Sequence, residues 1–315
     1  MIKLLYSTDW HTKPKSPSTR VDDYPAAIET KVRHFFRVGH ELGVDAFLDG
    51  GDKLDSPYTS AEYVIHLGKM IHEELRGKHM YGVLGNHDVI GWNPNTIKRT
   101  SLGVFQAFSP NVKLLDRTPT LLDFNGRKVE VSGVNSYAQL DRHIYDADGN
   151  ILEHRARDYM VKKTSDVPRI HIVHGYASEK PILDDIPHTV IEEFYETEAD
   201  ITLGAHEHTG TPIIKLKNGY FANPGALGRV FASHSEMNRM PQFVLIKIHD
   251  DGTKELEYIP CAVAKPGHEV MDRSALDEKK KKEAILAEAR GDIKQILKDM
   301  DIKGVDLLAI LDTYK

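Results

Sequence analysis

The sequence predicts an α/β protein, and three observations support this fold class. Strand and helix patterns alternate over residues 2–84, a series of short strands follows, and polar residues able to bind metal ions come directly after several strands. Alternation of this kind is typical of parallel strands joined by helical crossovers. Hydrophobic residues make up 40% and charged residues 28% of the 315 residues, as expected of a globular chain.

The first part of the chain carries the clearest helical signal. Apolar residues recur at helical spacing from Ala27 to Leu42, and Gly43 follows as a stop signal. The short apolar run at 44–48 is typical of a buried strand. The elements expected in this part are strands at 2–7, 44–48 and 79–84 and helices at 24–42 and 60–76.

The middle and second half are dominated by short strand patterns. Asn125-Gly126 separates two of them, and this pair favours a tight hairpin turn. We expect a helix at 151–163 and more antiparallel pairing than in the first part. The strands expected here are 112–115, 119–124, 127–134, 169–174, 200–204, 212–216, 219–222, 242–248 and 254–261.

A change of composition near residue 262 suggests a boundary. We expect one domain over 1–262 and a short helical C-terminal extension over 263–315, with apolar stripes at 285–300 and 305–313 separated by Gly304. Such helices could dock on a partner protein or pack on the chain's own sheet.

Charge and targeting signals narrow the functional classes. The net charge of −6 argues mildly against a chain that grips nucleic acid by its surface charge alone. No apolar run is long enough to span a membrane. The N-terminal residues show no basic segment followed by a long apolar core, so we expect no secretion signal. A single cysteine excludes an intrachain disulfide. We therefore expect a cytoplasmic protein with no membrane partner.

Five predicted strands each end in residues that can bind a metal ion. The carboxyl ends of strands in open α/β sheets are where ligands bind. One His-Gly or Gly-Asp pair carries no information, but burial of five such groups without a cation is costly. The groups are Asp9-Trp10-His11, Gly51-Asp52, Gly85-Asn86-His87-Asp88, His174-Gly175 and Gly204-Ala205-His206-Glu207-His208.

In this order and spacing, the five groups resemble the blocks of the calcineurin-like metallophosphoesterases, over residues 1–262. The resemblance implies a four-layer α/β/β/α sandwich and a dinuclear metal site. It implies that Asp9, His11 and His208 hold one ion, that Asn86, His174 and His206 hold the other, and that Asp52 bridges both. The mixed nitrogen and oxygen donors favour Mn²⁺, with Fe²⁺ or Zn²⁺ as alternatives.

The resemblance also implies catalytic roles for His87 and Asp88. His87 is expected beside the scissile group as an acid or a stabiliser of developing charge, and Asp88 is expected to orient its imidazole. Asp88 could instead be a simple turn cap.

Within the family, the opening Ser7-Thr8-Asp9-Trp10-His11 and the block Gly51-Asp52-Lys53-Leu54-Asp55 are most similar to the SbcD-type DNA-repair nucleases. Asp55, Asn223 and Arg229 are candidate substrate-binding residues. Asp55 could equally cap the helix near residue 60, and Arg229 could be an ordinary surface arginine.

This branch implies a DNA exonuclease or endonuclease that forms a homodimer and works with an ABC-type coiled-coil ATPase in repair or recombination. Two other functions stay open. A small-molecule phosphodiesterase or phosphatase, for example one acting on cyclic nucleotides, could use the same metal site and predicts a closed pocket. A non-catalytic scaffold is disfavoured because every ligand position and His87 are filled.

Overall fold

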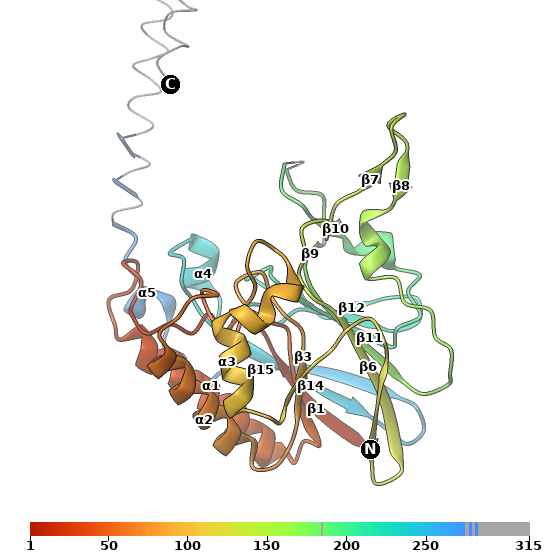
Figure 1. Cartoon of the computed structure of the whole chain (residues 1–315), viewed down its shortest axis with the longest axis horizontal. Coiled ribbons are helices and arrows are strands. Elements are labelled where there is room, and N and C mark those ends of the chain that lie inside the picture. The colour runs from red at the N-terminus through yellow and green to blue at the C-terminus, as the bar shows by residue number, and fades with distance from the viewer. Residues whose placement is uncertain (184, 275–276, 279–280, 283–315) are drawn as a thin grey trace, which may run out of the picture. The chain divides into compact units, whose positions relative to one another are not determined.

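The computed structural model describes residues 1–183, 185–274, 277–278 and 281–282 (Figure 1). The chain divides into one unit from Met1 to Met271 and another from Asp272 to Lys315. The elements below all belong to the first unit. The helices expected at 285–300 and 305–313 lie outside the described residues. Within the described part, no helix is long and apolar enough to cross a membrane.

The first sheet has six strands in the order β15-β14-β1-β2-β3-β4. Its four N-terminal strands are parallel, and β14 and β15 add to the β1 edge in antiparallel pairing. The strands are β1 (Ile2–Ser7), β2 (Ala46–Asp49), β3 (Met80–Gly82), β4 (Val112–Leu114), β14 (Gln242–Ile248) and β15 (Lys254–Pro260).

The second sheet has seven strands, with six in the order β12-β13-β11-β9-β6-β5 and β10 paired to β9. The strands are β5 (Thr120–Phe124), β6 (Arg127–Val134), β9 (Arg169–Ser178), β10 (Thr189–Val190), β11 (Ile201–Ala205), β12 (Ile214–Lys215) and β13 (Tyr220–Ala222). The central strands β6, β9, β11 and β13 are parallel to one another. The pairs β5–β6, β12–β13 and β14–β15 are antiparallel, so the expectation of more antiparallel pairing than in the first part is confirmed, although the centre of this sheet is parallel.

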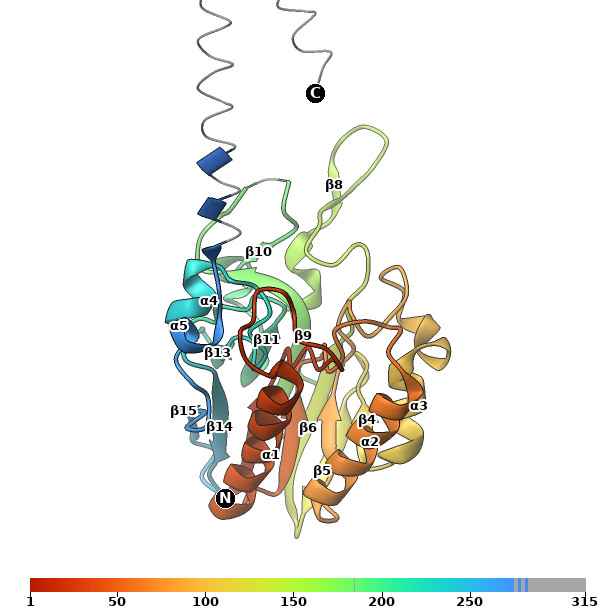
Figure 2. The ribbon, with the colours of Figure 1, turned by 90° about the vertical axis from the view of Figure 1, so that its left-hand side faces the viewer.

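Helices α1 (Tyr24–Leu42), α2 (Ala61–Leu75) and α3 (Ser101–Phe108) lie together on the first sheet (Figures 1 and 2). The Asp23 carboxylate caps the start of α1 by accepting from the Ala26 N–H, and Gly43 ends it with a φ of 64°. The apolar stripe that predicted this helix is the face that it buries. The short helices α4 (His234–Asn238) and α5 (Gly267–Val270) lie near the end of the unit.

Alternate residues of the first sheet feed two cores, one on each side. Leu5 and Phe47 pack against the helices, whereas Leu4 and Leu48 face the second sheet. A third core covers the outer face of the second sheet and contains residues of the 3₁₀ turns η2 (Arg155–Asp158) and η3 (Ile191–Phe194). The α/β fold class is confirmed, with 3₁₀ turns forming the outer layer on the second sheet.

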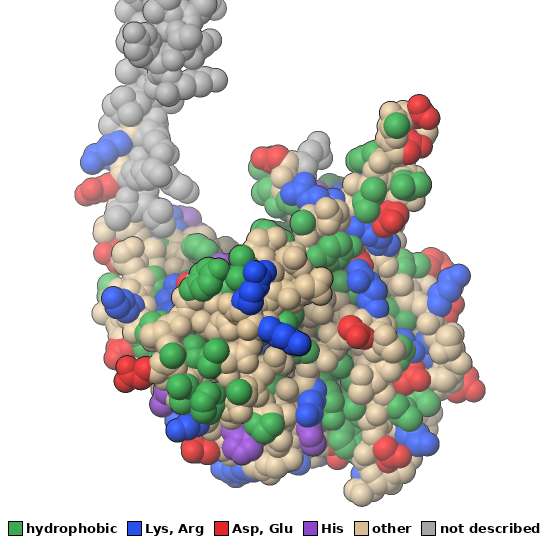
Figure 3. Space-filling view, in the orientation of Figure 1, with side chains coloured by type: hydrophobic (Ala, Val, Ile, Leu, Met, Phe, Trp, Pro, Cys, Tyr) green, Lys and Arg blue, Asp and Glu red, His purple; other side chains and the backbone are tan. Residues whose placement is uncertain are grey.

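The helix expected at 151–163 is absent from the structure. Asp146 accepts hydrogen bonds from the backbone of Asp148 and Asn150 and so closes a hairpin of β7 (Ile144–Tyr145) and β8 (Ile151–Glu153). This hairpin projects from the sheets in both views (Figures 1 and 2). Apolar side chains are visible on its surface, where Tyr145 and Leu152 are exposed (Figure 3).

Candidate metal centre

The predicted ligands converge from the ends of five strands of both sheets. Asp9 and His11 follow β1, Asp52 follows β2, and Asn86 and His87 follow β3. On the second sheet, His174 lies within β9, and His206 and His208 follow β11. The two sheets therefore share one edge at which their ligands meet, as the order of blocks in the sequence predicts.

The backbone at this edge has unusual geometry. Asp9, His11, Asp52 and His206 all have positive φ, between 48° and 66°. Such values are uncommon for residues with a side chain, and they cluster at functional sites. Gly85 is required for close approach, because a Cβ there would overlap the Asp52 carboxylate. The loops are thus folded tightly around the ligand side chains.

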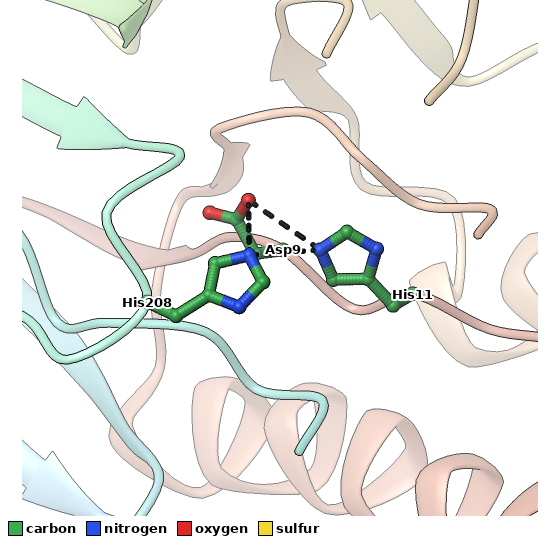
Figure 4. A group of neighbouring side chains, drawn as sticks. All are labelled: Asp9, His11 and His208. Atoms are coloured by element: carbon green, nitrogen blue, oxygen red, sulfur yellow. Dashed lines mark hydrogen bonds and ion pairs between the residues drawn. The ribbon is translucent and has the colours of Figure 1, made fainter. Parts of the chain in front are cut away.

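Three of these side chains form a first triad of Asp9, His11 and His208 (Figure 4). The Nε2 atoms of the two histidines lie 3.1 Å apart, and each lies 3.7 Å from Oδ1 of Asp9. The three donor atoms point toward one another, as ligands of a single ion do. This is the set that the family resemblance implied for one metal ion.

A second triad consists of Asp52, His174 and His206. Nε2 of His174 lies 3.4 Å from Oδ2 of Asp52 and 3.3 Å from Oδ1 of Asn86. Nδ1 of His174 lies 2.6 Å from the Gly50 carbonyl oxygen, which can only accept a hydrogen bond. Nδ1 therefore carries a proton. Although burial opposes it, the charge of Asp52 raises the pKa of His174 to about 9, so Nε2 also carries a proton that faces the two oxygens. A divalent cation would take the place of that proton.

The two triads meet at Asp52, whose Oδ2 also lies 3.9 Å from Nε2 of His11. Both Asp9 and Asp52 are fully buried, yet Oδ1 of Asp9 and Oδ2 of Asp52 have no hydrogen-bond partner among the described residues. Unpaired buried carboxylate oxygens are costly unless a cation binds them. The donor chemistry therefore fits two divalent ions that share Asp52.

Burial also keeps two of the ligand imidazoles neutral. Burial lowers the pKa of His206 to about 4, and His174 lowers it further. Burial likewise lowers the pKa of His208 to about 3 despite the charge of Asp9. Neutral imidazole is the form that binds metal, so these two side chains are in the required state at neutral pH.

His87 lies beside the cluster. Its ring centroid is 4.9 Å from that of His11 in an edge-on arrangement. Its Nδ1 lies 2.8 Å from the backbone oxygen of Asp55, so Nδ1 donates and Nε2 is left for another partner. The Asp55 carboxylate faces Nδ1 of His11 at 3.4 Å. Asp55 therefore orients two histidines, and Ser60, not Asp55, precedes α2 as its N-cap residue.

A family model for the calcineurin-like phosphoesterases matches residues 2–210, a span that contains both triads. The chain belongs to this family. Members of the calcineurin-like phosphoesterases are hydrolases with a dinuclear metal site, which agrees with the two triads joined at Asp52. No curated protein sequence matches the chain.

The solved structures to which the chain is similar include TT1561 of Thermus thermophilus, with 15% identity and a TM-score of 0.48. The match covers 82% of this chain and 98% of that one. Another is the NAD nucleotidase NadN of Haemophilus influenzae, with 12% identity and a TM-score of 0.47 over 82% of this chain. This chain spans 49% of the NadN chain.

Asp88 does not contact the His87 imidazole as expected. Its Oδ2 accepts hydrogen bonds from the backbone N–H groups of Asp52 and Gly85, at 2.8 and 2.9 Å. Burial raises the pKa of Asp88 to about 6, and the Asp52 charge adds to this effect. Asp88 thus joins the loops after β2 and β3 and positions the shared carboxylate, while the Asp55 carbonyl positions His87.

Two predicted substrate residues lie behind the site. Asn223 is buried, donates to the Glu207 carbonyl at 2.9 Å and accepts from the Gly225 N–H, so it supports the loop that carries His206 and His208. Arg229 is only 2% exposed and donates to the carbonyls of Arg239 and Lys265. These contacts give both residues structural roles, contrary to the expectation that they bind substrate.

Sequence reasoning missed the aromatic residues near the second triad. Trp92 and Tyr176 lie with their ring centroids 6.2 and 6.0 Å from that of His206. Tyr176 comes two residues after His174 on the same strand, so strand alternation could have placed it on the same face. The sequence gives a weaker signal for Trp92. It lies in the turn sequence Gly91-Trp92-Asn93-Pro94, which follows the third ligand block and so places it near the ligands.

Proposed function

We propose that this calcineurin-like phosphoesterase is a two-metal phosphodiesterase that cleaves DNA. The observation that carries the metal-dependent chemistry is the pair of triads joined at Asp52, with buried carboxylate oxygens that no described protein group satisfies. Asp9, His11 and His208 would hold one ion, Asn86, His174 and His206 the other, and Asp52 both. We propose Mn²⁺ as the native ion, with Fe²⁺ and Zn²⁺ as alternatives.

Two bound divalent ions supply Lewis-acid stabilisation of a phosphoester and a water activated for attack. The chain's own contribution is to hold its donors at fixed positions and to present His87. The Nε2 atom of His87, left free by the Asp55 carbonyl, can stabilise or protonate the oxygen that leaves phosphorus. Asp55 and Asp88 are positioning residues for this arrangement.

A polymeric substrate is supported by the space beside the second triad. A cavity of about 340 Å³ is lined by His174, His206 and Trp92, and an adjoining cavity of about 430 Å³ shares Trp92, Tyr137 and Ala138 with it. Arg142 lines the first cavity and is exposed, so a cation is available to a phosphate there. Arg117 lines the second cavity but is paired with the Asp158 carboxylate. Together with the SbcD-like sequence blocks, this extended space favours DNA over a small closed ligand.

The test compares linear double-stranded DNA, single-stranded DNA and bis-p-nitrophenyl phosphate in the presence of Mn²⁺, with repeats in Fe²⁺ and Zn²⁺. His87→Ala is expected to lower hydrolysis by about 100-fold or more, because general acid–base groups contribute at this scale. His72→Ala on the exposed side of α2 is the matched control and keeps full activity. Cleavage of the small diester without cleavage of DNA would replace the nuclease with a small-molecule phosphodiesterase.

We further propose that the enzyme is a homodimer and the nuclease subunit of an ABC-type coiled-coil ATPase, as the sequence blocks of the SbcD type imply. Light scattering of the full chain tests the dimer. Co-purification with a co-expressed ABC-type coiled-coil ATPase, and loss of that association when residues 283–315 are removed, tests the proposed partner. A monomer that binds no ATPase contradicts both proposals without affecting the hydrolytic one.

A further inference from the structure

The cavity beside the second triad has aromatic and apolar walls. It has a volume of about 340 Å³ and opens next to His174 and His206. A pocket of this size, mostly apolar with a few polar groups, is typical of small organic ligands. Its remaining lining residues are Trp92, Ser136, Tyr137, Ala138, Leu140, Asp141, Arg142, Gly175, Tyr176, Ile186 and Pro187.

Two aromatic rings in this pocket are fixed relative to a metal ligand. The rings of Trp92 and Tyr176 stand at 77° and 80° to the His206 imidazole, with centroid distances of 6.2 and 6.0 Å. Tyr176 is also bridged to His206 through the backbone. A flat ligand bound against these rings therefore lies next to the atoms that hold the second ion.

The backbone of Trp92 points to a role other than packing. Its φ is 58°, in the left-handed region that a bulky residue rarely adopts, and its side chain is 45% exposed. The turn is held by the Asn93 N–H, which donates to the Ile90 carbonyl at 3.2 Å. Backbone strain that places a large exposed aromatic ring at the edge of an active site is typical of ligand-binding residues.

The polar side chains of the pocket differ in whether they already have hydrogen-bond partners. The Asp141 carboxylate accepts from the Tyr176 N–H, the Tyr159 hydroxyl and the Thr189 hydroxyl, and so is fully engaged. Ser136 is 1% exposed, and its hydroxyl has no hydrogen-bond partner among the described groups. The hydroxyl oxygen is itself almost inaccessible to solvent, so the rings of Trp92 and Tyr176, not Ser136, supply the contacts for a ligand.

We propose that this pocket is a nucleobase subsite, which receives the base of the nucleotide whose phosphate lies at the metal ligands. The proposal rests on the proposed phosphodiesterase function and names its substrate class as nucleoside phosphodiesters. Stacking on Trp92 and Tyr176 supplies the binding, and it tolerates all four bases because every base has a flat face. Arg142, exposed at the rim, is placed to meet a neighbouring phosphate.

Tryptophan fluorescence tests binding directly. The chain has two tryptophans, and Trp10 is fully buried, so Trp92 is the one that a pocket ligand can quench. Thymidine 5′-monophosphate is expected to quench the emission saturably, whereas deoxyribose 5-phosphate is not. Tyr176→Ala is expected to weaken the binding of thymidine 5′-monophosphate by about tenfold, while the fluorescence of Trp92 is still quenched at saturation. Equal responses to both ligands, or no response to either, would overturn the subsite.

Kinetics separates this proposal from the hydrolytic one. The probes are thymidine 5′-p-nitrophenyl phosphate and methyl p-nitrophenyl phosphate, which share a leaving group and differ in the base. Wild type is expected to show a KM about tenfold lower for the thymidine ester, Trp92→Phe to keep most of this preference, and Trp92→Ala to lose it.

Tyr145→Ala, on the exposed hairpin, is the matched control and keeps the ratio of the two KM values. Hydrolysis of both esters with the same KM would refute the subsite and leave the phosphodiesterase intact. Hydrolysis of neither, with saturable quenching by the nucleotide, would refute the phosphodiesterase and leave the base-binding pocket.

Discussion

Strand β9 carries two buried histidines, His171 and His174, with opposite environments. Near its start, His171 has both ring nitrogens satisfied: Nδ1 accepts from the Ser132 hydroxyl at 2.9 Å, and Nε2 donates to the Asp158 carbonyl at 2.9 Å. Further along, His174 donates from Nδ1 to Gly50, and its Nε2 faces the oxygens of Asn86 and Asp52. Burial alone therefore does not identify a metal ligand, whereas a ring nitrogen that faces the oxygens of other predicted ligands does.

The largest expected difference in hydrolytic activity is between the alanine variants of these two histidines. His174→Ala is expected to lower bis-p-nitrophenyl phosphate hydrolysis by more than about 100-fold, the loss that even second-shell partners of metal ligands can cause. It should also abolish the rise in melting temperature that Mn²⁺ gives the wild type. His171→Ala is expected to keep the metal-dependent shift while melting at a lower temperature. Loss of metal response in His171→Ala alone would reverse the assignment.

The next effect concerns pH. Burial lowers the pKa of His171 to about 4, and Asp158, Arg169 and Arg117 are the charged groups around it. An unfolded histidine titrates near 6.5, so between pH 6.5 and 4 only the unfolded state takes up the proton. The free energy of unfolding should fall by about 3 kcal/mol over this window as the pH decreases.

Urea unfolding at several pH values measures this slope. His171→Gln removes the titrating group and is expected to flatten the curve relative to wild type, since all other groups are common to both proteins. Parallel curves for the two proteins would show that His171 titrates normally.

Asp88→Asn tests the hydrogen bonds that connect the ligand loops after β2 and β3. The backbone N–H groups of Asp52 and Gly85 both donate to Oδ2, so the amide oxygen of asparagine can still accept from them. The N–H₂ group then replaces Oδ1 and faces the Leu54 N–H, which lies 3.5 Å from Oδ1 in the wild type, so the loop that carries Asp52 should be less well positioned. We expect Mn²⁺ affinity, measured by calorimetry, to fall by about 10–100-fold. An unchanged affinity together with lower kcat would instead favour direct action of Asp88 on His87.

The smallest effect is expected at Ser132. Ser132→Ala removes the donor to Nδ1 of His171 and should lower the free energy of unfolding by about 1 kcal/mol. Metal affinity and kcat should stay as in wild type, because the His174 side of the strand is not altered. Any loss of metal affinity would show that the surroundings of His171 and His174 are coupled.

The same contrast explains how much of the molecule could be predicted from sequence. The first helix was predicted to the residue because its apolar stripe and Gly43 both act locally. The ligands were found because they follow strands at short, regular intervals. The roles of Asp88 and Arg229 were not found, since the direction of a side chain in a tight turn depends on contacts from distant segments.

The second sheet was harder to predict for a different reason. Parallel strands need long crossovers, and periodicity detects those crossovers when they are helices. Here the connection from β6 to β9 contains a hairpin and the turn η2, and the connection from β9 to β11 contains β10 and η3. Neither gives a helical repeat, so the parallel centre of the sheet left little trace in the sequence. The helix α3, of eight residues, was also too short to stand out.

The left-handed backbone at Asp9, His11, Asp52 and His206 has a consequence for laboratory evolution. Each such residue costs the folded chain on the order of 1 kcal/mol, and glycine would relieve that cost while also removing a buried polar group. A library selected only for heat resistance in a chelating medium should therefore accumulate substitutions at these ligands first. The same library selected with metal present should retain the four ligand residues, because metal binding stabilises the folded state by more than the backbone strain destabilises it.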